Sequence, residues 1–107
     1  MGFVFRSGEV LDDFSSPYQH IEVMETAAFG RVFRLDGYLM TSEADEWFYH
    51  ENLNHIPAIT HPDPRTALII GGGDGGSARQ LLKYPSIEQV VVCELDAGVV
   101  AIADEYF

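Results

Sequence analysis

Alternating apolar and polar positions dominate the first half of the chain. Ile21 and Val23 are apolar residues separated by Glu22, and this period of two is typical of a strand with one buried face. Asp36-Gly37 lies between two such runs, and both residue types accept the positive φ of a tight hairpin turn. We therefore predict an antiparallel β-meander. Its expected strands are residues 18–24, 31–35 and 38–40, with an additional edge hairpin formed by residues 3–5 and 10–11.

A helical pattern follows the meander. Ser42 precedes Asp45 by three residues, which resembles a capping box, and the helix dipole favours acidic residues in a first turn. Pro57 is expected to kink or end the helix, because proline lacks the amide hydrogen that a helix interior needs. The apolar side of this helix is expected to consist of Trp47, Phe48, Leu53 and Ile56.

Continuous apolar runs replace the alternation beyond residues 61–64, a stiff segment with two prolines. Residues 66–70 and 89–93 are short runs of the kind found in buried parallel strands. A helix is expected over residues 77–83, and another from Asp96 onward. Two parallel strands cannot cover both of their faces, so we expect this part to be the truncated start of a larger sheet.

These patterns predict an α/β protein with two parts. Residues 1–62 are expected to form a small antiparallel β-meander domain with one helix. Residues 63–107 are expected to form the first βαβα unit of a Rossmann-like, methyltransferase-like domain with a parallel sheet.

A glycine-rich loop follows the first predicted parallel strand. Gly71, Gly73 and Gly76 match the pattern G-x-G-x-x-G between a strand and a helix. Glycine lets a ligand approach the backbone closely, and the start of the helix offers unpaired N–H donors. Glu94 ends the next strand 20 residues after Asp74, where a carboxylate typically accepts the hydroxyls of a ribose. Together these features predict a nucleoside-binding site.

Asp74 places a negative charge inside this loop. A carboxylate repels a phosphate or carboxylate ligand and attracts an ammonium group. A dinucleotide is therefore a poorer candidate than a sulfonium nucleoside with a free amine. The simpler interpretation is that Asp74 only caps the following helix.

Several motifs along the chain resemble those of the polyamine aminopropyltransferases, the spermidine synthases. The resemblance covers about residues 16–107, and the loop of residues 71–76 together with Tyr49, His50 and Glu51 is its most specific part. The other matching segments are residues 16–19, 29–31, 35–37, 43–46, 61–64 and 94–96. Members of the family have a small N-terminal β-domain and a Rossmann domain, and most are homo-oligomers. The resemblance therefore implies a homodimer or a homotetramer.

The resemblance also implies an activity and a role for each matching residue. The reaction would transfer the aminopropyl group of decarboxylated S-adenosylmethionine, a co-substrate, to putrescine, giving spermidine and methylthioadenosine without a tightly bound cofactor. Residues on the donor side would be Gln19, Gly71, Gly73, Asp74, Gly75 and Glu94. Residues on the polyamine side would be Tyr49, His50 and Asp74. The family's catalytic aspartate would lie beyond Phe107, and many members carry glutamine where this chain has Met40, so the preferred acceptor stays open.

Charge and composition exclude several other classes of protein. The chain of 107 residues has 17 acidic and 6 basic side chains and a net charge of −11, which disfavours nucleic acids and anionic membranes as partners. A single cysteine, Cys93, excludes an intrachain disulfide and a multi-cysteine zinc site. The sequence contains neither a membrane-length apolar run nor a secretory signal, so we expect a cytoplasmic protein with small-molecule partners.

Three alternatives stay open at this point. A methyltransferase that uses S-adenosylmethionine would share the fold and Glu94, but its donor carries a carboxylate that Asp74 would repel. A zinc site at His50 and His55 is disfavoured, because a spacing of five places the two rings ~140° apart around a helix, and no metal is expected. The N-terminal strands could also serve only as an oligomerisation module.

Overall fold

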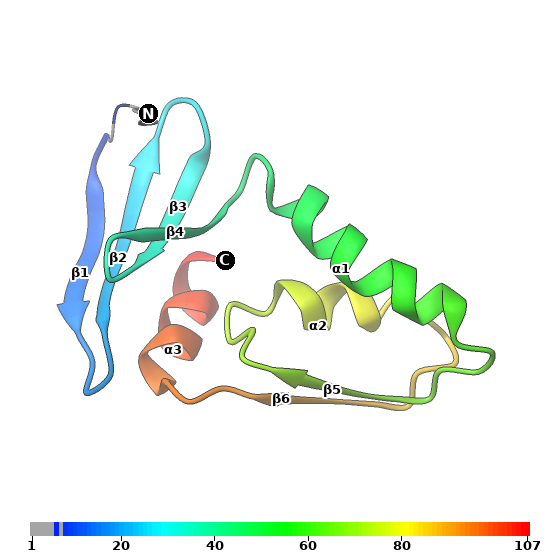
Figure 1. Ribbon diagram of the computed structural model, residues 1–107. Helices are drawn as coiled ribbons and strands as arrows, with labels where there is room; N and C mark the ends of the chain where they lie inside the picture. Colours follow the sequence, from blue (N-terminus) through cyan, green and yellow to red (C-terminus); the bar gives the residue numbers. More distant parts are fainter. Residues whose placement is uncertain (1–5, 7) are drawn as a thin grey trace. The chain divides into compact units, whose positions relative to one another are not determined.

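The computed structural model describes Arg6 and residues 8–107, which divide into two compact units (Figure 1). The first unit extends through Glu46, and the second begins at Trp47. The division that we predicted falls after residue 62, and would group the helix with the strands before it. In the structure the buried side of this helix includes Asn54, whose side-chain amide donates to Ser77 Oγ at 3.1 Å. This packing accounts for its grouping with the residues that follow.

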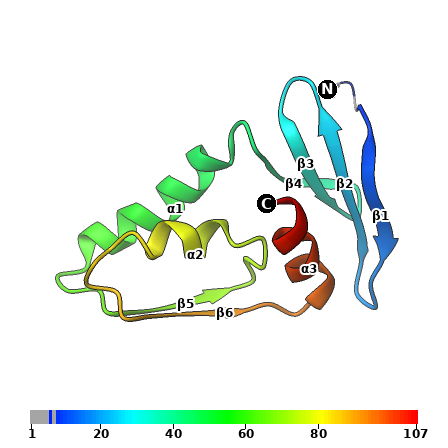
Figure 2. The ribbon, with the colours of Figure 1, turned by 180° about the vertical axis from the view of Figure 1, so that it is seen from behind.

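The first unit is a four-stranded antiparallel sheet in the order β1-β2-β3-β4 (Figure 2). Its strands are β1 (Val10–Ser15), β2 (His20–Thr26), β3 (Gly30–Leu35) and β4 (Tyr38–Ser42). The predicted meander is confirmed, and Val10 and Leu11 of the expected edge hairpin open β1, whereas residues 3–5 lie outside the described residues. Ile21 and Val23 are fully buried and Glu22 is not, as the alternation predicted.

The hairpin between β3 and β4 turns at Asp36 and Gly37. Their φ angles are 50° and 82°, the left-handed region that the predicted turn requires. Asp36 Oδ1 also accepts the backbone N–H of His20 at 2.8 Å. The turn is therefore tied to β2 as well as to its own two strands.

The helix α1 spans Glu46–Thr60; its start differs from the prediction, and of the two outcomes predicted for Pro57 only the kink stays a prediction. Ser42 is wrong as the capping residue, because β4 extends through it and pairs it with Val32. Its hydroxyl donates to Asp45 in the turn that separates β4 from α1. Pro57 lies inside the helix, which continues to Thr60, so the proline does not end it.

The second unit contains a two-stranded parallel sheet of β5 (Thr66–Ile70) and β6 (Gln89–Cys93), as predicted. The helix α2 (Gly76–Leu81) connects the strands, and α3 (Ala97–Tyr106) follows β6. Asp96 caps α3, because its Oδ1 accepts the N–H of Gly98 at 2.9 Å. Both ribbon views show α1 and α2 on the same side of the strand pair (Figures 1 and 2). Among the described residues, no helix has both the length and the apolar character needed to cross a membrane.

Candidate functional site

The glycine-rich loop connects β5 to α2. Gly71, Gly72 and Gly75 have φ angles of 78°, 70° and 81°, a region in which side chains other than glycine are strained. The N–H of Gly71 donates to the carbonyl of Cys93 at 2.9 Å, which ties the start of the loop to the end of β6. The loop therefore lies at the carboxyl ends of both parallel strands, the edge where ligands bind in open α/β sheets.

Glu94 follows β6 and contacts the loop directly. Its Oε2 accepts the N–H of Gly73 at 3.0 Å, and its Oε1 accepts the N–H of Asp96 at 3.1 Å. A methyl group on Gly73 would lie 2.6 Å from Glu94 Cγ, so glycine is needed at this contact. Each carboxylate oxygen keeps a second lone pair that can accept a hydroxyl of a ligand. The backbone thus holds Glu94 in place without using up its capacity as an acceptor.

Asp74 lies between α2 and the buried side of α1. Its Oδ1 accepts the N–H of Gly76 at 3.1 Å, but the N-cap of α2 is Gly75 and not Asp74, so the simpler interpretation of Asp74 as the capping residue is not borne out. Its Oδ2 lies 3.7 Å from Nε2 of His50, whose side chain is only 5% exposed. A Cβ on Gly76 would overlap the imidazole ring of His50. One oxygen of Asp74 therefore contacts the first residue of α2 while the other faces a histidine.

Tyr49 lies beside His50 on α1, whereas Gln19 belongs to the other unit. Tyr49 is 61% exposed, and its ring meets the ring of His50 edge-on with 5.3 Å between the centroids. Gln19 belongs to the first unit, between β1 and β2, where its N–H donates to Ser16 Oγ at 3.1 Å. Its part in donor binding stays a prediction. The predicted residues that the structure brings together around the loop are His50, Gly71, Gly73, Asp74, Gly75 and Glu94.

A cavity of about 340 Å³ opens beside the loop. Its lining residues are Gly73, Asp74, Gly75, Arg79, Val100, Ala103, Asp104 and Phe107. The contribution of α3 was not predicted from the sequence. The signal was present, because Val100, Ala103 and Asp104 share one face of the helix that follows Glu94. Two carboxylates, one guanidinium and apolar carbon line this cavity, and a net negative charge with apolar surface suits a ligand that has an ammonium group and an apolar chain.

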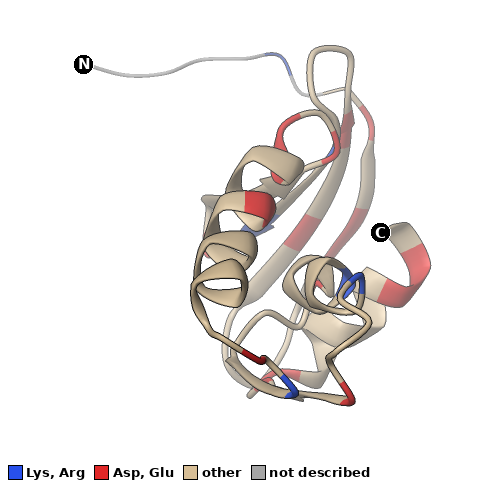
Figure 3. Ribbon diagram, turned by 90° about the vertical axis from the view of Figure 1, so that its right-hand side faces the viewer, with Lys and Arg blue, Asp and Glu red and all other residues tan. Residues whose placement is uncertain are grey.

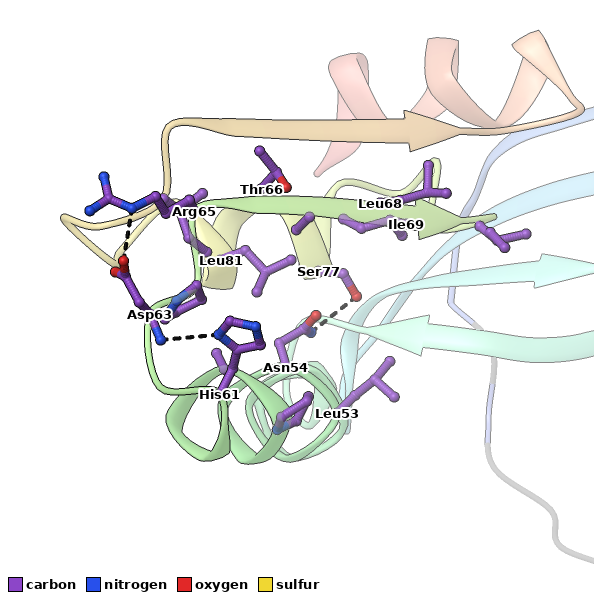
Figure 4. Close-up of a pocket in the computed structure, with 16 residues that line it drawn as sticks. Leu53, Asn54, His61, Asp63, Arg65, Thr66, Leu68, Ile69, Ser77 and Leu81 are labelled. Carbon is purple, nitrogen blue, oxygen red and sulfur yellow. Dashed lines mark hydrogen bonds and ion pairs between the residues drawn. The ribbon is translucent and has the colours of Figure 1, made fainter.

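A larger hollow of about 690 Å³ lies between α1 and β5 (Figure 4). Its apolar lining includes Leu53, Leu68, Ile69 and Leu81. At one end Arg65 pairs with Asp63 and Glu88 at 2.8 Å each, and these carboxylates raise the pKa of its guanidinium. None of the residues predicted to bind a ligand is among those that line this hollow. We therefore assign the candidate site to the loop and not to the larger space.

His50 and His55 lie in separate surroundings. Nδ1 of His55 is 2.7 Å from the hydroxyl of Tyr84, and its Nε2 is 3.0 Å from Oε1 of Gln80. Both ring nitrogens of His55 are thus engaged with α2 and the segment after it, whereas His50 faces Asp74. The two rings do not form one set of metal ligands, in agreement with their spacing.

Figure 3 shows acidic residues on strands, loops and helices, with few basic ones. The net charge of −11 therefore comes from acidic residues in several elements. It agrees with a preference for cationic small molecules over polyanions.

Two family models cover almost the whole chain. The model of the spermine/spermidine synthase domain matches residues 46–107, and that of the spermidine synthase tetramerisation domain matches residues 3–43. A polyamine aminopropyltransferase of Nitrosomonas europaea is 57% identical over 102 residues, which are 95% of this chain and 31% of that protein. One of Moorella thermoacetica is 52% identical over 101 residues, 94% of this chain and 36% of that protein.

Solved structures agree with these relatives. A spermidine synthase in complex with the transition state analogue AdoDATO matches with a TM-score of 0.93 and 44% identity, over 94% of this chain and 34% of that one. Spermidine synthase from Thermotoga maritima matches with a TM-score of 0.89 and 46% identity, over 91% of this chain and 34% of that one. The chain thus spans about a third of the length of these proteins. By sequence and by fold, the chain belongs to the spermine/spermidine synthase family.

Proposed function

We propose that the protein carrying this chain is a polyamine aminopropyltransferase. It would transfer the aminopropyl group of decarboxylated S-adenosylmethionine to putrescine, producing spermidine and methylthioadenosine. The observation that carries this proposal is the carboxylate of Asp74 within the glycine loop, with one oxygen 3.7 Å from Nε2 of His50. The activity for which the relatives are named supports the same conclusion.

Glu94 would hold the nucleoside end of the donor. Its two oxygens are positioned by N–H groups of Gly73 and Asp96, so the carboxylate does not need to reorganise when a ribose binds. Gly73 and Gly75 would let the donor approach the backbone of the loop. Gln19 would contact the thioadenosine part, as the family resemblance implies.

Asp74 would distinguish the donor from its carboxylated precursor. Decarboxylated S-adenosylmethionine ends in an ammonium group, which Asp74 attracts, whereas S-adenosylmethionine also carries a carboxylate. Two like charges about 4 Å apart near a protein surface repel each other by about 4 kcal/mol. This repulsion argues against a methyltransferase, although such an enzyme would share the fold and the role of Glu94.

The protein contributes to this reaction mainly by positioning the two substrates. The lone pair of a neutral amine of putrescine attacks the methylene carbon next to the sulfonium, a C–N bond forms and the C–S bond breaks. The bonding electrons stay on sulfur, which becomes the neutral thioether of methylthioadenosine. Tyr49 and His50 would line the acceptor side, and holding the amine in line with the carbon lowers the barrier. The amine must also give up a proton to a base, for which the family resemblance implies an aspartate beyond Phe107.

The assembly and location of the protein belong to the same proposal. We expect a homodimer or homotetramer in the cytoplasm. The match of residues 3–43 to the tetramerisation domain supports an oligomer built through the first unit.

The test compares a ligand that carries the amine, decarboxylated S-adenosylmethionine, with one that lacks it, methylthioadenosine. We expect Asp74→Asn to weaken binding of decarboxylated S-adenosylmethionine by tenfold or more, as a charge-assisted contact is lost, and to affect methylthioadenosine far less. Glu94→Gln is the matched control, because it should weaken both ligands equally. If Asp74→Asn weakens both ligands to the same extent, Asp74 acts only on the structure of the loop and the proposal loses its main support.

A further inference from the structure

A cluster of possible metal ligands lies in the first unit, outside the site described above. Asp13 of β1 pairs directly with Glu22 of β2, and His20 precedes Glu22 by two residues, so the three side chains share one face of the sheet. Each offers one ligand atom, and these atoms all lie within 4.8 Å of one another. We propose that Asp13, His20 and Glu22 bind a divalent transition-metal ion, of which Zn²⁺ fits the ligands best.

The distances in this cluster are close to those of a coordination site. Nε2 of His20 lies 2.9 Å from Oδ1 of Asp13 and 3.5 Å from Oε1 of Glu22. Ligand atoms around a tetrahedral zinc ion lie about 3.3 Å apart, since each bond is about 2.0–2.1 Å long. Small rotations of the side chains are therefore enough to admit the ion.

Residues outside the cluster already orient two of its three side chains. Ser15, which pairs with His20 across the strands, places its Oγ 3.2 Å from Nδ1 of the imidazole. When Nε2 binds a metal, Nδ1 carries the proton. The Nδ1–H group can then donate a hydrogen bond to this hydroxyl, as histidine ligands do in other metal sites. Arg34 donates to Oε2 of Glu22, which leaves Oε1 directed at His20. Ser15 and Arg34 thus fix the orientation of two of the three side chains.

Charge and access also favour a cation. Asp13 and Glu22 supply two negative charges, Arg34 offsets one, and Asp36 adds another through its contact with the backbone of His20. Within the single chain the side chains of Asp13 and His20 are 53% and 40% exposed, which leaves space for an ion with a water in the fourth position. Imidazole with carboxylates suits zinc better than the all-oxygen sites that calcium and magnesium prefer.

The experiment titrates the purified, chelator-treated protein with ZnCl₂ in the calorimeter. We expect one saturable zinc ion per chain with a micromolar dissociation constant. His20→Gln and Asp13→Asn should each weaken binding by about tenfold or more, and Ser15→Ala by a smaller factor. His61→Gln is the matched control, because His61 is an exposed histidine in the second unit. The zinc affinity of this variant should equal that of the parent protein.

Circular dichroism of each variant shows whether the sheet is intact, and the exposed position of Asp13 makes Asp13→Asn the variant least able to disturb it. Cobalt substitution adds a second readout, since a tetrahedral site gives visible absorption that His20→Gln should abolish. A titration without saturable binding would overturn the proposal and leave the cluster as a hydrogen-bonded ion pair. Unchanged affinity in a folded His20→Gln variant, or a loss in His61→Gln, would overturn it as well.

Discussion

Replacing Gly76 with alanine tests how closely α2 approaches α1. The three atoms nearest to a Cβ on Gly76 all belong to the imidazole of His50, and all are too close for the two groups to coexist. The ring is 5% exposed, so it has little room to move aside. One surplus methyl group in a well-packed interior typically costs about 1–3 kcal/mol. We predict that Gly76→Ala lowers the free energy of unfolding by this amount.

A double-mutant cycle shows whether the ring is the cause. His50→Ala removes the imidazole, so Gly76→Ala should cost much less in that background, with a coupling energy of about 1–3 kcal/mol. The assay is denaturant unfolding of the parent protein, both single variants and the double variant. Gly71→Ala is the matched control, because a Cβ there meets no atom and the cost comes from its φ of 78° alone. That cost should be the same with and without His50.

Equal costs of Gly76→Ala in the two backgrounds would refute this reasoning. The close approach of His50 would then not be what requires glycine at the start of α2. A cost near zero in the parent protein would refute it too, since it would mean that the ring has room to shift.

Two further predictions concern ligand binding and the isolated chain. Glu94→Gln should weaken methylthioadenosine binding by about 1–3 kcal/mol, because a charged acceptor is lost, and unchanged affinity in calorimetry would remove Glu94 from the site. Residues 1–107 alone should show no aminopropyl transfer and should self-associate, because Leu68 and Ile70 are 65% and 85% exposed and burying each would contribute about 1.5–3 kcal/mol. Spermidine formation by this chain, with a monomer in size-exclusion chromatography, would contradict that expectation.

Local signals were sufficient for most of the secondary structure. The apolar runs at β5 and β6 have the bounds that the sequence predicts, and Asp96 caps α3 as expected. The turn at Asp36 and Gly37 was also predictable, because the conformation depends on which residues tolerate positive φ. Each of these features is decided by a few neighbouring residues, so no distant contact is needed to specify it.

The ends of α1 show where local signals fail. Ser42 has the composition of a helix cap, but its pairing with Val32 extends β4 through it. Pro57 should interrupt a helix, yet α1 continues past it, and the packing of Asn54 on Ser77 lies within the same segment. Contacts with other elements outweigh the preference of a single residue when they bury a whole side of a helix or complete a strand.

Some features of the candidate site could also be predicted from local sequence, and others could not. The sequence by itself determined the glycine loop, the acid inside it and the acid at the end of the next strand, because these residues follow the chain order of a βαβ unit. Only the tertiary structure decided that Glu94 reaches the N–H of Gly73, that His50 lies against Gly76, and that Asp13, His20 and Glu22 meet across two strands. Such contacts join segments that are far apart in sequence or depend on strand register, and the pattern of residue types contains neither the register nor the distance between helices.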